Sequence, residues 1–144
     1  MHAEILKPVV ALAIWTMVMW VWLYATRIPA MNRLKIAPDR LAQDNPPTLD
    51  QLLPASVQWK AHNYNHLHEA PTVFYAIALL LAMIGAGNGF HATLAWAYVA
   101  LRVVHSLVQA TINRVMLRFT IFTLSSVVLM LLIACAAVQV FAAA

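Results

Sequence analysis

The segment QWKAHNYNHLHEAPTVFYA, residues 58–76, decides the fold because it carries a polar helical face directly into an apolar stretch. At 3.6 residues per turn, about a third of the helix circumference collects hydrogen-bonding side chains, and the opposite side is apolar. The polar positions are Gln58, His62, Asn65, His66 and Glu69, and the opposite ones are Tyr64, Leu67, Pro71 and Phe74. Lipid offers polar groups no partners, so such a stripe must face protein or water.

The amino-acid composition indicates whether this helix lies in water or in a membrane. Of the 144 residues, 63% are hydrophobic and 10% are charged, and the mean hydropathy is +0.76. A soluble domain of this size would not expose so apolar a surface. The chain has only three glycines among long runs of Ala, Leu, Val and Met, which favours helices over the alternating strands of a membrane barrel. We therefore predict an all-α integral membrane protein, a four-helix bundle in one domain.

Four membrane spans account for the apolar segments, at about residues 8–26, 57–85, 92–111 and 119–141. Residues 27–56 contain five prolines and too few apolar residues for another span. We expect a loop there that either covers a site or is partly disordered. A cleaved signal peptide is a less favoured interpretation of the first span, because its apolar stretch is too long and ATRIPA, residues 25–30, lacks a convincing cleavage pattern.

The basic residues set the orientation of the chain. Only Lys7 lies on the side of the termini, whereas seven basic residues lie in or beside the first and third loops: Arg27, Arg33, Lys35, Arg40, Lys60, Arg114 and Arg118. By the positive-inside rule, we expect these loops in the cytoplasm and both termini outside it, in a bacterial inner membrane. The high pI, about 9.6, then reflects topology, and we expect no nucleic-acid partner.

A second polar stripe follows one face of the third span and consists of Tyr98, Arg102, His105, Ser106, Gln109 and Asn113. An arginine near the middle of a span costs at least about 2.5 kcal/mol when it is unpaired. Glu69 is the only acid within any span. We therefore expect an ion pair between Arg102 and Glu69.

Other chemistries remain as alternatives. His62 and His66 stand four residues apart, with Glu69 three further on, which is a spacing that metal ligands use on a helix. No second ligand motif accompanies them, so we favour hydrogen-bonding histidines and predict no metal site. A haem held between His66 and His105 is a further alternative. Cys135 lies among Ala and Val and is expected to be a buried apolar residue.

Three motifs resemble the MAPEG family, the membrane-associated proteins in eicosanoid and glutathione metabolism. NHLHEAPTVFYA at residues 65–76 resembles the family's Asn-x-x-Glu-x-x-Pro segment, YVALRVVHS at residues 98–106 its third-helix Arg and Tyr/His face, and LRFTIF at residues 117–122 its fourth-helix entry. The resemblance covers nearly the whole chain. It implies four-helix subunits that assemble as homotrimers and bind glutathione between subunits, near the cytoplasmic side.

The resemblance also implies roles for individual residues. Arg118 matches the arginine associated with the glutathione thiol and is the expected catalytic residue, with Arg102 as the alternative. The residues expected to bind glutathione are Arg27, Lys60, His62, Asn65, His68, Glu69, Arg102, His105 and Gln109. The chain departs from the family pattern where His68 replaces Glu and where Ala61 replaces Arg, beside Lys60. Lysine lacks the planar fork with which arginine grips a carboxylate.

The function implied by the resemblance is that of a glutathione-dependent transferase or peroxidase acting on lipophilic electrophiles or lipid hydroperoxides. Glutathione would be a co-substrate, and the expected partners are membrane lipid, an apolar electrophile and two further copies of the chain. The alternative is a non-catalytic membrane protein that binds lipid or another small ligand on the same scaffold.

Overall fold

The structure, a computed structural model, describes residues 3–42 and 46–142. Its elements are α1 (Leu6–Arg33), η1 (Pro38–Ala42), α2 (Leu49–Leu52), α3 (Ala55–His66), α4 (Ala70–Met83), α5 (Phe90–Thr111) and α6 (Val115–Ala142). The described residues form no strand, which confirms the all-α prediction. Three stretches are long and apolar enough to cross a membrane, namely Leu6–Arg33, Ala55–Met83 and Val115–Ala142.

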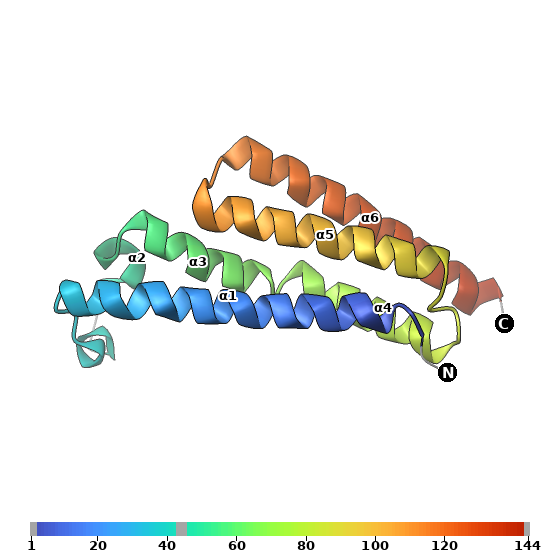
Figure 1. The fold of residues 1–144 in the computed structure, drawn as a ribbon, viewed down its shortest axis with the longest axis horizontal. Coiled ribbons are helices and arrows are strands. Elements are labelled where there is room, and N and C mark those ends of the chain that lie inside the picture. The colour runs from blue at the N-terminus through green and yellow to red at the C-terminus, as the bar shows by residue number, and fades with distance from the viewer. Residues whose placement is uncertain (1–2, 43–45, 143–144) are drawn as a thin grey trace.

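The long helices run alongside one another and alternate in direction (Figure 1). α5 packs against α6 and α3, whereas α1 packs against α3, α4 and α5. The two termini and the turn between α4 and α5 lie at one end of the molecule, and η1 and α2 lie at the other (Figure 1). The turn between α5 and α6 points toward the η1 and α2 end, so the first and third connections lie on the same side.

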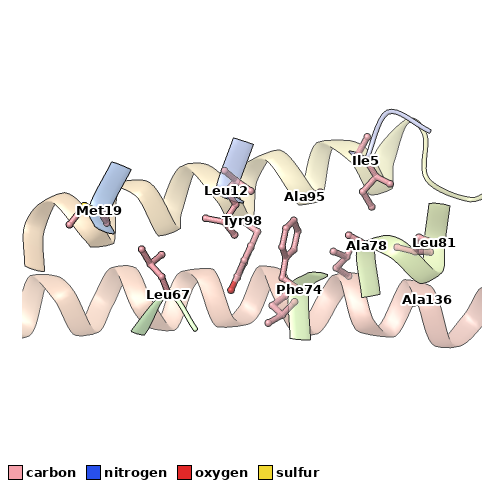
Figure 2. Close-up of a cluster of buried hydrophobic side chains, with 14 of the residues drawn as sticks. Ile5, Leu12, Met19, Leu67, Phe74, Ala78, Leu81, Ala95, Tyr98 and Ala136 are labelled. Carbon is pink, nitrogen blue, oxygen red and sulfur yellow. The ribbon is translucent and has the colours of Figure 1, made fainter. Parts of the chain in front are cut away.

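The core is a strip of apolar side chains where α1, α4, α5 and α6 meet (Figure 2). Leu12 and Met19 of α1 are fully buried and lie over α5. The rings of Phe74 and Tyr98 stack at a centroid distance of 4.7 Å, which joins α4 to α5. This strip fixes the position of α5 between its neighbours, and α5 carries half of the buried polar side chains in the described residues.

The second predicted span, residues 57–85, is not one continuous helix. α3 ends at His66 and α4 begins at Ala70, with a turn between them. Pro71 occupies the first turn of α4, where a missing backbone N–H costs nothing. Glu69, just before α4, has φ −92° and ψ −101°, which is outside the helical region. Pro71, which was expected inside a continuous helix, therefore lies in the first turn of a separate helix.

α1 is longer than the predicted span of residues 8–26, because it continues to Arg33. The first seven residues of the predicted loop at 27–56 are therefore helical, and residues 43–45 of that loop lie outside the described part. Pro29 removes only one backbone hydrogen bond from α1. Arg27 donates from Nη2 to Gln58 Oε1 at 3.3 Å, which ties this extension to α3. α5 and α6 begin two and four residues before the predicted spans at 92 and 119.

Residues 3–5 are attached to the turn between α4 and α5. The backbone N–H of Ile5 donates to the carbonyl oxygen of Gly87 at 2.8 Å, and that of Glu4 donates to Asn88 Oδ1 at 2.9 Å. The Ile5 side chain is fully buried. A Cβ at Gly87 would lie 2.7 Å from Ile5 Cγ2, so only glycine allows this close approach.

Candidate functional site

A small cavity of about 190 Å³ lies where the end of α3 meets α5 and the first turns of α6. It is lined by His66, His105, Val115, Arg118, Phe119 and Phe122. The cavity therefore brings one guanidinium and two imidazoles together with two aromatic rings. Two of the predicted site residues, Arg118 and His105, line it.

The turn between α5 and α6 positions Arg118. Arg118 Nη1 donates to Asn113 Oδ1 at 2.7 Å. Asn113 has φ +49°, a left-handed conformation that asparagine tolerates better than most residues with a side chain. The neighbouring Arg114 is exposed and lines no part of the cavity. Of these two arginines, only Arg118 can reach a molecule bound there.

The two histidines of the cavity differ in exposure and in neighbours. His105 is 2% exposed, and its ring lies 6.2 Å from the ring of Phe122. His66 lies edge-on to His105, at a ring centroid distance of 6.2 Å, and its Nδ1 is 3.1 Å from Glu69 Oε2. His66 was expected only in the polar stripe or as a metal or haem ligand. The structure makes it a lining residue of the cavity.

Arg102 does not line the cavity itself but contacts two of its lining residues, His66 and Phe122. Its side chain is 1% exposed, and Nη2 donates to the carbonyl oxygen of His66 at 2.8 Å. Its guanidinium also lies 5.9 Å from the ring of Phe122. The predicted ion pair between Arg102 and Glu69 does not form within the described residues. Because α3 ends at His66, the His66 carbonyl accepts from Arg102 and, at 3.4 Å, from the Glu69 backbone N–H, and the exposed Glu69 side chain lies beside His66 instead.

Further polar side chains are buried between α3 and α5, which pack against each other. Asn63, Ser106 and Gln109 are each at most 1% exposed, and their side-chain polar atoms find no hydrogen-bond partner in the described part of the chain. Such atoms can still bind water or a polar ligand. Gln109 was predicted as a site residue, whereas Asn63 was missed because it lies outside the polar stripe.

The remaining histidine and asparagine candidates, on α3 and in the turn after it, do not line the cavity. His62 Nε2 lies 3.1 Å from Asp50 Oδ1, and His68 Nδ1 lies 2.8 Å from the Tyr64 carbonyl oxygen. Both histidines and Asn65 are exposed. α3 buries Gln58, Ala61 and Asn63 against its neighbours, so most of the predicted polar stripe faces outward from the single chain.

Arg27 and Lys60 lie at the contact between α1 and α3. Lys60 Nζ donates to the Ser56 carbonyl oxygen at 2.6 Å and lies 5.5 Å from the ring of Trp22. Arg27 is bonded to Gln58 and does not line the cavity. Within the described residues, no three His, Cys, Asp or Glu side chains are grouped so that they could hold a metal ion.

A sequence model of the MAPEG family matches residues 5–138 of the chain. The chain belongs to the MAPEG family. Together with the three apolar stretches, this establishes an integral membrane protein, in a family that includes glutathione transferases and peroxidases as well as other members. No curated protein and no solved structure gives a significant match.

All three motifs that resemble MAPEG proteins contribute to the cavity. His105 comes from YVALRVVHS, Arg118 comes from LRFTIF, and His66 comes from NHLHEAPTVFYA. NHLHEAPTVFYA is divided by the helix break, because its first residue, Asn65, is exposed on α3 and its proline lies in the first turn of α4. This MAPEG chain therefore directs residues of all three motifs toward the cavity and part of NHLHEAPTVFYA outward.

Proposed function

We propose that this MAPEG protein is a glutathione-dependent transferase or peroxidase for lipophilic electrophiles, with Arg118 as its catalytic residue. The proposal rests on the cavity in which the Arg118 guanidinium lies beside the apolar walls formed by Phe119 and Phe122. A cation favours a thiolate over a thiol, and each unit by which it lowers the thiol pKa corresponds to about 1.4 kcal/mol. Low local dielectric strengthens this effect.

The homotrimer is part of the proposal, and the exposed stripe supports it. Along α3 and α4, the outward residues are His62, Asn65, Glu69, Thr72, Val73 and Ala76. Polar groups on a membrane helix need protein partners, and small residues allow helices to approach closely. A second copy of the chain would cover this stripe and give its polar groups partners.

The size of the cavity also supports a shared site. Sites for small molecules usually enclose about 300–1,000 Å³, whereas the cavity in one chain measures about 190 Å³. We therefore place glutathione between subunits, where the exposed ligands of one chain can reach the cavity of the next. In this arrangement, His62, Asn65 and His68 bind the peptide from one subunit. Arg118, His105, Gln109 and Arg102 belong to the other, together with the Glu69 that lies beside its His66. Arg27 and Lys60 lie at the entrance.

The proposed orientation puts this site at the cytoplasmic face. α5 is 22 residues long, enough to cross the hydrocarbon, and we propose it as the third of four crossings. Arg118 lies near the turn between α5 and α6, on the side of the first loop and its basic residues. The positive-inside rule favours the cytoplasm for that side and places both termini outside. An anionic tripeptide could then enter from water while apolar electrophiles enter from the bilayer.

Ultraviolet difference titration of the detergent-solubilised protein with glutathione tests the proposal. A transferase or peroxidase of this kind should give a saturable thiolate absorbance near neutral pH, because the bound thiol ionises beside Arg118. Saturable binding of glutathione without that absorbance would exclude the proposed chemistry.

The alternative function is non-catalytic binding of lipid or another apolar ligand. It is favoured by a groove of about 750 Å³ along the outer face of α1, lined almost entirely by apolar side chains such as Val10, Ile14, Met17 and Val21. Retention of a defined lipid during purification, together with no glutathione signal in the titration, would support this alternative.

A further inference from the structure

We propose that His66 accepts the proton of the bound thiol and that Glu69 orients its imidazole for this role. The inference rests on the proposed function, because it requires glutathione in the cavity. It assigns the proton transfer to a side chain of α3, whereas Arg118 of α6 supplies only the positive charge.

The position of His66 suits proton transfer. Its side chain lines the same cavity as Arg118. Nδ1 lies 3.1 Å from Glu69 Oε2, which is within ion-pair distance, although the two atoms form no hydrogen bond in this geometry. Nε2 lies on the other edge of the ring, away from Glu69. The bond from Arg102 to the His66 carbonyl holds the residue in place at the helix break. Because Nδ1 is the nitrogen beside Glu69, we assign Nε2 to a ligand in the cavity.

The charges around the cavity favour His66 over His105 as the acceptor. The titratable and charged groups facing it are Glu69 from its own turn, Arg102 and His105 from α5, and Arg118 from α6. His105 is buried together with Arg102, faces the cavity that the partly exposed Arg118 also lines, and has no carboxylate within ion-pair distance in the described residues. Glu69 attracts the imidazolium that forms on His66 and offsets the repulsion from Arg102 and Arg118.

The step is a simple proton transfer. The S–H bond of glutathione breaks, its electron pair stays on sulfur, and the proton forms an N–H bond at His66 Nε2. The result is a thiolate beside the Arg118 guanidinium and an imidazolium beside the Glu69 carboxylate. Each new charge then lies near an opposite charge, which a cavity with aromatic walls requires.

The retained proton indicates a class of electrophile. When a thiolate adds to an α,β-unsaturated carbonyl compound, the S–C bond forms and the displaced electron pair moves toward the carbonyl. The imidazolium can then return its proton to the carbon next to the carbonyl, which restores neutral His66. Addition therefore uses the proton that His66 stores, whereas displacement of a halide does not.

Proton release during glutathione binding tests this assignment. The parent protein in detergent is mixed with glutathione at about pH 7.5, where an ordinary histidine is largely neutral and an ordinary thiol largely protonated. Thiolate absorbance and a pH indicator in weak buffer are recorded together. We expect the parent to form thiolate with little proton release, because the proton stays on His66. His66→Gln should release about one proton per thiolate and should form it about 10²-fold more slowly.

Two further variants separate a chemical role from a structural one. Glu69→Gln should give intermediate proton release, because the imidazolium loses its carboxylate while the α3 backbone is unchanged. His91→Gln, at the opposite end of α5, should match the parent. Equal proton release by the parent, His66→Gln and Glu69→Gln would overturn the role of His66 and leave the proposed function intact. Absence of thiolate in the parent would overturn the proposed function and this inference with it.

Discussion

Arg102 donates a hydrogen bond to the carbonyl oxygen of His66 across 2.8 Å, and this bond joins the middle of α5 to the point where α3 ends. The carbonyl lies at the helix break, where α3 ends and Pro71, in the first turn of α4, has no N–H to continue the hydrogen bonds of α3. A buried arginine in this chain therefore stabilises an irregular backbone segment.

Arg102→Met should destabilise the protein by about 1–3 kcal/mol. The His66 carbonyl loses its charged donor and keeps only the longer bond, of 3.4 Å, from the Glu69 backbone N–H. Thermal unfolding in detergent measures the change, and Arg33→Met, at the exposed end of α1, is the matched control. Arg102→Lys should recover part of the loss. A variant as stable as the parent would show that removing a buried charge compensates for the lost bond.

Arg118→Ala should remove most of the thiolate absorbance while glutathione still binds, because the cation that stabilises the thiolate is absent. Arg118→Lys should be intermediate, since it keeps the charge but loses the planar fork. Arg114→Ala is the control, because that residue is exposed and lies outside the cavity lining. If Arg118→Ala ionises bound glutathione as well as the parent does, the catalytic role belongs to another residue, and Arg102 is the next candidate.

Asn113 is expected to act on the thiolate through Arg118. Asn113→Gly keeps the left-handed backbone but loses the bond to Arg118 Nη1, so it should lower the thiolate fraction with little change in thermal stability. Asn113→Ala loses the bond and also strains the backbone, at a cost of about 1–2 kcal/mol. Comparing absorbance and melting temperature for the two variants separates these effects. Identical behaviour of both variants would contradict the assignment.

The proposed subunit contact predicts a trimer that depends on the outward face of α4. Ala76→Trp should disrupt the trimer, because the indole would occupy space needed by the neighbouring helix, as measured by native mass spectrometry in mild detergent. Val18→Trp, on the exposed apolar face of α1, should leave the trimer intact. A monomeric parent would rule out the proposed assembly, and a trimeric Ala76→Trp variant would move the contact elsewhere.

The close approach of residues 3–5 to the turn before α5 can be tested with two glycines. Gly87→Ala should destabilise more than Gly85→Ala, although only Gly85 has a positive φ, of +78°. A methyl group at position 87 meets Ile5 Cγ2 at 2.7 Å, whereas nothing lies within 4 Å at position 85. The melting temperatures of the two variants should differ in that order, and the reverse order would mean that Ile5 moves aside at little cost.

The sequence predicted the helical class, the membrane setting and the family, because long apolar runs and the motifs at residues 65–76, 98–106 and 117–122 are local signals. It also predicted that Arg102, His105 and Gln109 share one helical face, since the periodicity of one straight helix determines this, and the structure shows that the face is buried. The prediction of a continuous helix through His66 and Pro71 was wrong. A proline in the sequence is equally compatible with a kink inside one helix and with the first turn of a new helix.

The site could be predicted only in part, for two physical reasons. Once α3 and α4 are separate helices, a single periodicity no longer describes which residues share a face, and the stripe divides into buried and exposed members. The partner of Arg102 was also unpredictable from charges alone, because it is a backbone carbonyl. His66 lines the cavity because of the way the end of α3 packs against α5 and α6. Comparison with the family motifs had given His66 no role in binding glutathione.

The break after His66 has a consequence for insertion into the membrane. α3 has 12 residues and α4 has 14, so they extend only about 18 Å and 21 Å. Neither reaches across a hydrocarbon layer of about 30 Å. The proposed second crossing is therefore complete only when both helices stack end to end, and the side chain that donates to the His66 carbonyl at the junction comes from α5, which the ribosome makes later. During synthesis, this crossing should remain incomplete until Arg102 has emerged and α5 has packed beside it.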